Sequence, residues 1–195
     1  KKTLNSISYN SLESIDKILA IDNCSTDKTL QELKDIKKDK LKKKLIIFQN
    51  LKNFGLGGSL KKSFIFAIEK EFTHLLIIHS DDQGNCEKII SNFLTIIKKI
   101  KDLDFIMASR FMKESNLKGY SNLRILGNYF FNFLTLIFTG QRFSDSGCGI
   151  ISLKVESLKN IDFLNLSNTF YFNPQLNIEL SKTKNLKKVD IPLDW

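Results

Sequence analysis

The stretch "HLLIIHSDDQGN" (His74–Asn85) is the first indication of the fold class of this chain. Its first half is an apolar run, typical of a buried strand, and the run ends abruptly at Ser80, Asp81 and Asp82. Taken alone, two carboxylates at the end of a strand indicate either a solvated turn or a site for a hard cation such as Mg²⁺ or Mn²⁺. The rest of the chain must decide between these two interpretations.

Other apolar runs end in the same way. Residues 18–21, 45–48 and 105–108 are predicted strands, and the segments between them carry apolar residues at helical spacing. Strands that alternate with helices predict an α/β fold, with a mostly parallel sheet and helices on both faces. Ligands of such sheets bind beyond the carboxyl ends of the strands. One site is therefore expected where four polar segments meet: Asp22-Asn23, 50–58, 80–83 and Ser109-Arg110.

Strand geometry selects the metal ligands within the opening stretch. Neighbouring residues of a strand point to opposite faces, so Asp81 pairs better with His79 or Gln83 than with Asp82. A histidine nitrogen among oxygen ligands favours Mn²⁺ somewhat over Mg²⁺.

A glycine-rich turn, Gly55-Leu56-Gly57-Gly58-Ser59, precedes the second predicted helix. It is either an ordinary helix-initiating turn or a place where backbone amides approach a phosphate. The turn departs from the dinucleotide fingerprint because Leu60 stands at its third glycine position, and no Gly-Lys-Ser/Thr follows as in a P-loop.

Composition limits the classes of protein that fit. The 195 residues, 42% of them hydrophobic, suffice for a single domain over residues 1–195. The formal charge of +9, mostly from Lys, reflects either compositional bias or attraction to phosphates or an anionic membrane. No nucleic-acid-binding motif accompanies it, so a nucleic-acid partner is not expected. Three widely spaced cysteines argue against structural zinc and a disulfide framework, and they fit a cytoplasmic setting.

A predicted helix over residues 121–138 is apolar on more than one face. It is either a deeply buried helix or one that lies in a membrane interface, with Lys118 and Arg124 near its start. It is too short to span a bilayer.

Taken together, the motifs resemble those of family 2 glycosyltransferases with the GT-A fold, and most closely the branch that contains dolichyl- or polyprenyl-phosphate sugar transferases. The resemblance rests on the order and spacing of six blocks: "IDNCSTDKT" (Ile21–Thr29), "NFGLGGSLKKSF" (Asn53–Phe64), "HSDDQGN" (His79–Asn85), "ASRF" (Ala108–Phe111), "FSDSGCGIISLKVESL" (Phe143–Leu158) and "VDIPLDW" (Val189–Trp195).

The resemblance implies a reaction and its participants. It implies a hexosyltransferase that moves a sugar from a UDP- or GDP-linked donor to an acceptor. The expected acceptor is a polyprenyl phosphate or a cell-envelope glycan precursor, at the inner face of the cell membrane. A Mg²⁺ or Mn²⁺ cofactor and peripheral membrane contact are expected with it. The alternative is a non-catalytic, transferase-like module that binds only a nucleotide sugar or a membrane.

The resemblance also implies roles for individual residues. Asp145 is the candidate base or acceptor-orienting carboxylate, and Arg110 and Arg124 are candidates for binding an acceptor phosphate. Metal binding is expected of Asp81, Gln83 and His79. Nucleotide-sugar binding is expected of five residues: Asp22, Asn23, Gly55, Ser80 and Asp81.

The chain departs from the family pattern at positions that normally carry acids. Asn23 replaces the second acid of the first block, and His79 replaces the first Asp of D-x-D. Asn173 and Gln175 stand where F-D-x-E would supply two acids. The family's opening strand, with its P-A-Y-N-E-type motif, is not found in this sequence, so an N-terminally truncated domain without its first strand is expected.

Overall fold

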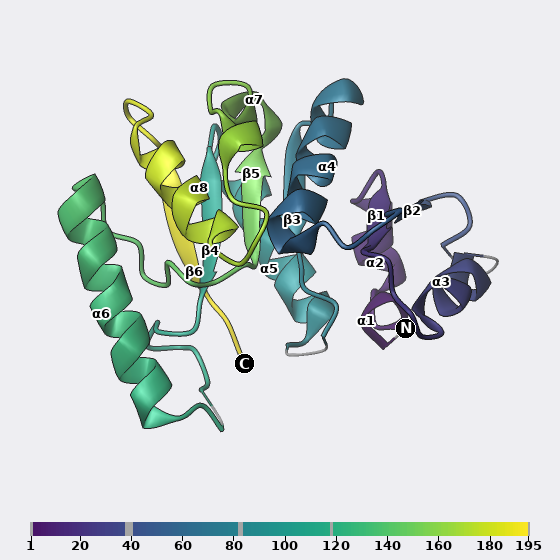
Figure 1. Ribbon diagram of the computed structural model, residues 1–195, viewed down its shortest axis with the longest axis horizontal. Coiled ribbons are helices and arrows are strands. Elements are labelled where there is room, and N and C mark those ends of the chain that lie inside the picture. The colour runs from purple at the N-terminus through teal and green to yellow at the C-terminus, as the bar shows by residue number, and fades with distance from the viewer. Residues whose placement is uncertain (1, 38–40, 82–83, 118, 195) are drawn as a thin grey trace.

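The computed structural model of the protein describes residues 2–37, 41–81, 84–117 and 119–194 (Figure 1). Strands form at the predicted apolar runs: β1 (Ile18–Asp22), β2 (Leu45–Gln49), β3 (His74–Ile77) and β4 (Phe105–Ser109). Two more strands follow, β5 (Ile151–Lys154) and β6 (Lys188–Pro192). The helices are α1 (Lys2–Asn5), α2 (Tyr9–Glu13), α3 (Thr29–Lys37), α4 (Gly55–Glu69), α5 (Cys86–Lys99), α6 (Asn122–Thr139), α7 (Val155–Leu158) and α8 (Phe172–Ser181), with a 3₁₀ turn, η1 (Phe163–Asn165).

The main sheet has the strand order β3-β5-β4-β6. β6 pairs in parallel with β4, whereas β5 is antiparallel to both β3 and β4. All strands of this sheet except β5 therefore point the same way, and the predicted α/β fold is confirmed. The antiparallel strand was not predicted, because the sequence before it is a glycine-rich polar stretch.

Helices cover both faces of the main sheet, as predicted. Alternation along β4 sends Phe105 and Met107 to a core shared with α4, α7 and α8, and sends Ile106 and Ala108 to a second core shared with α5. Both faces of β4 are fully covered, which explains why its sequence is continuously apolar rather than alternating.

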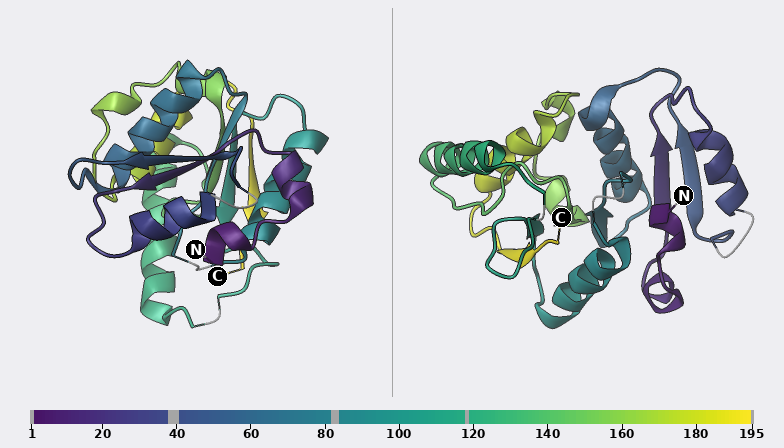
Figure 2. Two further views of the ribbon diagram at one scale, coloured as in Figure 1. Left: turned by 90° about the vertical axis from the view of Figure 1, so that its right-hand side faces the viewer. Right: turned by 90° about the horizontal axis from the view of Figure 1, so that it is seen from below.

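β1 and β2 form a separate parallel sheet beside the main one (Figures 1 and 2). Its core, formed with α2 and α3, reaches α5 through Cys86 and Ile90. Within the described residues β1 pairs only with β2, so the strands do not make one continuous sheet. The expectation that a further strand belongs to this domain stays a prediction.

Helix α6 lies at the opposite end of the long axis from β1 and β2 (Figures 1 and 2). Its apolar side chains point outward: Leu123 is 80% exposed, Phe130 60% and Phe138 78%. The interpretation of α6 as a deeply buried helix is therefore wrong. None of the helices within the described ranges is both long and apolar enough to cross a membrane.

The inward face of α6 is mostly polar. Asn128, Asn132, Thr135 and Thr139 recur at helical spacing and, with Ile125 and Leu134, are the less exposed positions of the helix. Asn132 accepts a hydrogen bond from the Ser146 amide (2.8 Å) and donates to the Ser144 carbonyl (2.8 Å). The helix is thus held by hydrogen bonds on one side and presents apolar residues on the other.

The glycines of α4 permit a close approach between two backbones. A Cβ on Gly57 would lie 2.2 Å from the Ser167 carbonyl oxygen and 2.9 Å from the Phe172 side chain. Gly57 and Gly58 both donate their amides to the Asn168 carbonyl, at 2.9 and 3.4 Å. The segment before α8 is therefore fixed against the first turn of α4.

We expect Gly57→Ala to destabilise the fold by about 2 kcal/mol, because backbone must move to admit the new methyl group. Gly127→Ala is the matched control, since Gly127 lies within α6 and a Cβ there would meet no described atom within 4 Å. It should stabilise the fold by about 0.5–1 kcal/mol through helix propensity alone. Urea unfolding of both variants measures the difference, and equal midpoints would contradict it.

Candidate functional site

The carboxyl end of β1 carries Asp22 and Asn23, which have different environments. Asp22 is 2% exposed, and its Oδ1 accepts a hydrogen bond from the Ser25 amide (3.2 Å). Its Oδ2 is buried and has no hydrogen-bond partner among the described residues. Such an oxygen is costly to bury, so Asp22 is a strong candidate for contacting a ligand.

Asn23 is engaged within the protein through both ends of its amide. Its Nδ2 donates to Asn53 Oδ1 (2.8 Å) and to the Gly55 carbonyl (3.3 Å). Its Oδ1 accepts from Asn50 Nδ2 (2.8 Å) and from the Phe54 amide (3.0 Å). An aspartate could accept but not donate, so this network explains why an amide occupies the position.

The start of α4 follows this network directly. Gly55 has a φ of +74°, and a Cβ there would lie 2.2 Å from the Asn168 carbonyl oxygen. Because that carbonyl also accepts the Gly57 and Gly58 amides, these two amides are engaged within the protein. Close packing at a helix-initiating turn, the first of the two interpretations of this segment, therefore accounts for its glycines. The expected role of Gly55 in donor binding stays a prediction.

The end of β3 brings together His79, Ser80 and Asp81. Ser80 and Asp81 are exposed, whereas His79 is half-buried. His79 and Asp81 line the same small pocket with Ile78, Ile89 and Ile150. Burial lowers the pKa of His79, and the charge of Asp81 acts in the opposite direction. Gln83 and Asp82 lie outside the described residues.

The His79 ring packs against the backbone before β5. A Cβ on Gly149 would lie 2.0 Å from His79 Nε2 and 2.9 Å from Asn173 Nδ2. Gly149 is therefore the residue that leaves room for the imidazole. Asn173, in the first turn of α8, is 6% exposed.

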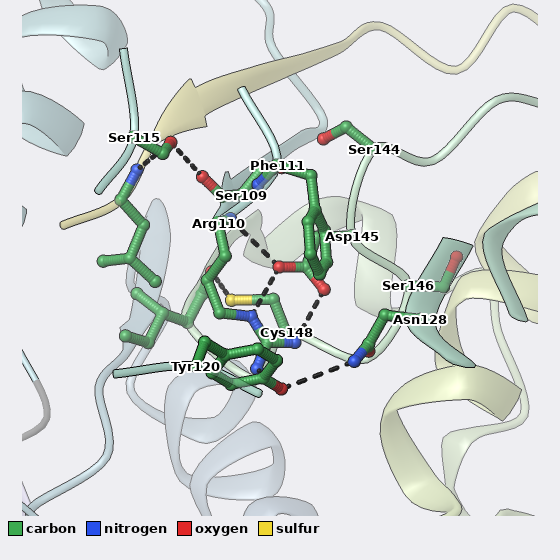
Figure 3. A network of polar contacts seen from close by, with 12 residues as sticks. Ser109, Arg110, Phe111, Ser115, Tyr120, Asn128, Ser144, Asp145, Ser146 and Cys148 are labelled. Carbon is green, nitrogen blue, oxygen red and sulfur yellow. Dashed lines mark hydrogen bonds and ion pairs between the residues drawn. The ribbon is translucent and has the colours of Figure 1, made fainter. Parts of the chain in front are cut away.

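Arg110 and Asp145 form a buried, bidentate ion pair (Figure 3). Arg110 Nε and Nη2 donate to the two carboxylate oxygens at 2.7 and 2.8 Å, and the Arg110 amide donates at 3.0 Å. The side chains are 8% and 0% exposed. Burial lowers the pKa of Arg110, but hydrogen bonding and the charge of Asp145 outweigh burial and hold this pKa above its ordinary value.

The pair is tied to α6 through Tyr120 (Figure 3). Arg110 Nη1 donates to Tyr120 Oη (2.9 Å), and Asn128 Nδ2 donates to the same oxygen (3.4 Å). Asn128 also donates to the Arg124 carbonyl one turn earlier (2.7 Å). The exposed residue Arg124 therefore lies within one helical turn of the Arg110 network.

Cys148 lies beneath this network and is fully buried. Burial, followed by the charge of Asp145, raises the pKa of its thiol to about 12. A protonated, buried thiol is a poor nucleophile, so Cys148 has a structural role.

Whether the site can hold a divalent cation depends on the side chains at the end of β3. No cluster of three or more His, Cys, Asp or Glu side chains able to hold a metal occurs within residues 2–37, 41–81, 84–117 and 119–194. His79 and Asp81 supply one imidazole and one carboxylate on the same pocket, which suits a partial ligand set completed by substrate oxygens.

Comparison with known proteins agrees with the strand-end motifs. Residues 1–161 match the family described as Glycosyl transferase family 2. The chain belongs to this family. An uncharacterized protein of Methanocaldococcus jannaschii is 26% identical to it over 179 residues, which cover 90% of this chain and 68% of the relative. Family membership indicates glycosyl transfer from a nucleotide sugar as the activity of this domain.

The structure adds residues that the sequence did not indicate as part of the site: Tyr120, Asn128 and Asn132. For two of them a signal existed. Asn128 and Asn132 are amides four residues apart in an otherwise apolar helix, which places them on one face. The sequence indicated Asn50 and Asn173 but not which residues lie beside them, Asn23 and His79 respectively, because these are distant in sequence.

We expect Asp145→Asn to lower the free energy of unfolding by about 3 kcal/mol, because it leaves the Arg110 charge buried without its counter-charge. Urea unfolding measures this loss. The exposed pair of Lys159 with Glu156 is the control, and Glu156→Gln should leave the urea midpoint unchanged. A tolerated Asp145→Asn change would show that the pair is dispensable for folding.

Proposed function

We propose that this protein is a metal-dependent hexosyltransferase that moves a sugar from a UDP- or GDP-sugar to a polyprenyl phosphate. In this proposal it acts in cell-envelope polysaccharide biosynthesis at the inner face of the cell membrane. The observation that carries the choice of acceptor is the position of a fixed guanidinium, Arg110, beside a helix with an exposed apolar face. A lipid phosphate combines an anionic head with an apolar tail and matches both features.

The donor side of the proposal rests on the ends of β1 and β3. Asp22 offers a buried carboxylate oxygen without a partner among the described residues, which suits a donor group on a nucleobase or ribose. Asn23 acts as a positioning residue, since its amide holds the β1 end against the start of α4. Ser80 and Asp81, both exposed, are proposed to face the diphosphate side.

Metal dependence is proposed through Asp81, His79 and Gln83. When bound, Mg²⁺ or Mn²⁺ would supply positive charge that stabilises the departing nucleoside diphosphate. Asp81 is the ligand that the observations favour, because its carboxylate is exposed at the strand end and shares a pocket with His79.

The acceptor side assigns Asp145 a positioning role. Both of its oxygens already accept hydrogen bonds from Arg110, and the carboxylate is fully buried. A phosphate acceptor is an anion at neutral pH and needs no base of its own. Asp145 therefore holds Arg110, and Arg110 and Arg124 bind the phosphate.

Membrane contact is proposed through the outward face of α6. Leu126, Phe130, Phe133 and Ile137 form one stripe along this helix and are 55–67% exposed. With a net charge of +9, the chain is suited to an anionic lipid surface.

The first test is donor binding followed by transfer. Isothermal titration of the full-length protein with UDP-glucose and GDP-mannose in the presence of Mn²⁺ should detect one of the two. Asp81→Ala should reduce transfer to a polyprenyl phosphate by at least about tenfold, because it removes a metal ligand. Absence of binding to both donors would contradict the proposal.

The second test concerns the membrane. We expect the protein to float with phosphatidylglycerol vesicles, and Phe130→Gln to weaken this binding about tenfold by removing an inserted ring. Tyr9→Gln is the matched control, since Tyr9 is a 73%-exposed aromatic residue on α2. Equal losses in both variants, or no flotation of the parent protein, would contradict the proposed contact.

A non-catalytic module that binds a nucleotide sugar or a membrane is the second candidate. It is favoured by the engagement of Asp145 with Arg110 and by the neutral residues at Asn23 and His79. Donor binding without transfer to any phosphate or glycan acceptor, in protein that also binds vesicles, would favour this module over the enzyme.

A further inference from the structure

Two neutral side chains that stand where the family resemblance expects acids meet at one point of the fold. His79 follows β3 and Asn173 lies at the start of α8, and they are separated by nearly half of the chain. His79 Nε2 and Asn173 Nδ2 both approach the position that a Cβ of Gly149 would occupy, at 2.0 and 2.9 Å. The two departures from the family pattern are therefore one local change, and sequence alone does not show that they are neighbours.

Asn173 is unsatisfied in this environment. It is 6% exposed, and its Oδ1 is buried with no hydrogen-bond partner among the described residues. Buried amide oxygens in folded proteins are nearly always hydrogen-bonded, so an unpaired one calls for an explanation. His79 remains partly exposed beside it, at the end of β3.

We propose that His79 and Asn173, brought together over Gly149, form a subsite that hydrogen-bonds a hydroxyl group of the transferred sugar. This inference rests on the proposed function and specifies which part of the donor these two residues contact. It makes Asn173 a specificity-determining residue and gives His79 a second role beside the metal binding proposed for it.

The chemistry of the two groups selects a hydroxyl. A carboxamide offers both a donor and an acceptor, an imidazole whose other nitrogen binds a metal still offers an N–H donor, and a sugar hydroxyl can pair with each of them. A phosphate or a divalent cation would be better matched by cationic or anionic groups, respectively. Asp81, two residues after His79, lies on the exposed side of the strand end, where the charged part of the donor would bind.

The position of the pair also favours discrimination. A site built to hydrogen-bond a hydroxyl rejects ligands that lack it, because its buried polar atoms are then left unpaired. Gly149 contributes by having no side chain, since any Cβ there would displace the imidazole.

The experiment compares a nucleotide sugar with its own nucleoside diphosphate. Affinities of the full-length protein for UDP-glucose, UDP, GDP-mannose and GDP are measured by titration calorimetry with Mn²⁺ present. In the parent protein the sugar should add affinity in one of the two pairs. We expect Asn173→Ala to weaken binding of that nucleotide sugar about three- to tenfold and to leave its nucleoside diphosphate unchanged.

Further variants separate this role from folding. His79→Ala should remove the affinity added by the sugar and, because His79 is also a proposed metal ligand, should weaken the nucleoside diphosphate as well; His74→Ala is its control because His74 lies at the other end of β3. Gly149→Ala should also reproduce the loss by displacing His79. Thermal unfolding of each variant shows whether it is folded, and a purely structural defect in Asn173→Ala would lower both affinities together.

The outcomes distinguish this inference from the proposed function. If the parent binds none of the four compounds, the proposed function fails and the subsite fails with it. If the parent binds them but Asn173→Ala and His79→Ala keep the affinity added by the sugar, only the subsite is overturned. Equal weakening of nucleotide sugar and nucleoside diphosphate by Asn173→Ala would also overturn it, since Asn173 would then act on the diphosphate.

Discussion

The ion pair of Arg110 with Asp145 is the interaction on which this end of the molecule depends. It joins the end of β4 to the segment that leads into β5, and through Tyr120 it reaches α6. A buried guanidinium and a buried carboxylate are each costly without the other, so every element that carries one of them is held in place by the pair. The backbone amide of Arg110 bonds to the same carboxylate and fixes the turn after β4 as well.

This constraint explains the unusual orientation of α6. A helix with so many large apolar residues would ordinarily turn them toward a core. Here Asn128 and Asn132 bind Tyr120 and the backbone around Ser146, so the polar stripe must face inward. Most of the apolar residues of α6 then face outward, and the same network that fixes Arg110 also creates the exposed surface beside it. A charged group and an apolar surface are thereby placed together by one set of contacts.

Much of the fold could be predicted because its strands and helices follow from local sequence patterns. The apolar runs at 18–21, 45–48 and 105–108 became β1, β2 and β4 within one residue of their predicted ends. β5 could not be predicted, because its antiparallel pairing depends on β3 and β4 rather than on its own sequence. Which face of α6 packs against the protein could not be predicted either. Periodicity shows that a helix has a polar and an apolar face, but not which of them lies inward. At the candidate site, the sequence indicated Arg110 and Asp145 separately, and only the fold shows that they bind each other.

The neutral residues at family-typical acid positions follow a common logic. At Asn23 the amide both donates and accepts within a network that a carboxylate could not complete. His79 and Asn173 stand at two family acid positions that both lie against Gly149. The local charge therefore differs from the family pattern, while the capacity for hydrogen bonding remains. Losing an acid at a single exposed position would weaken attraction for a cation and nothing more. In the subsite proposed above, groups that donate and accept hydrogen bonds at positions packed this closely would favour a hydroxyl ligand.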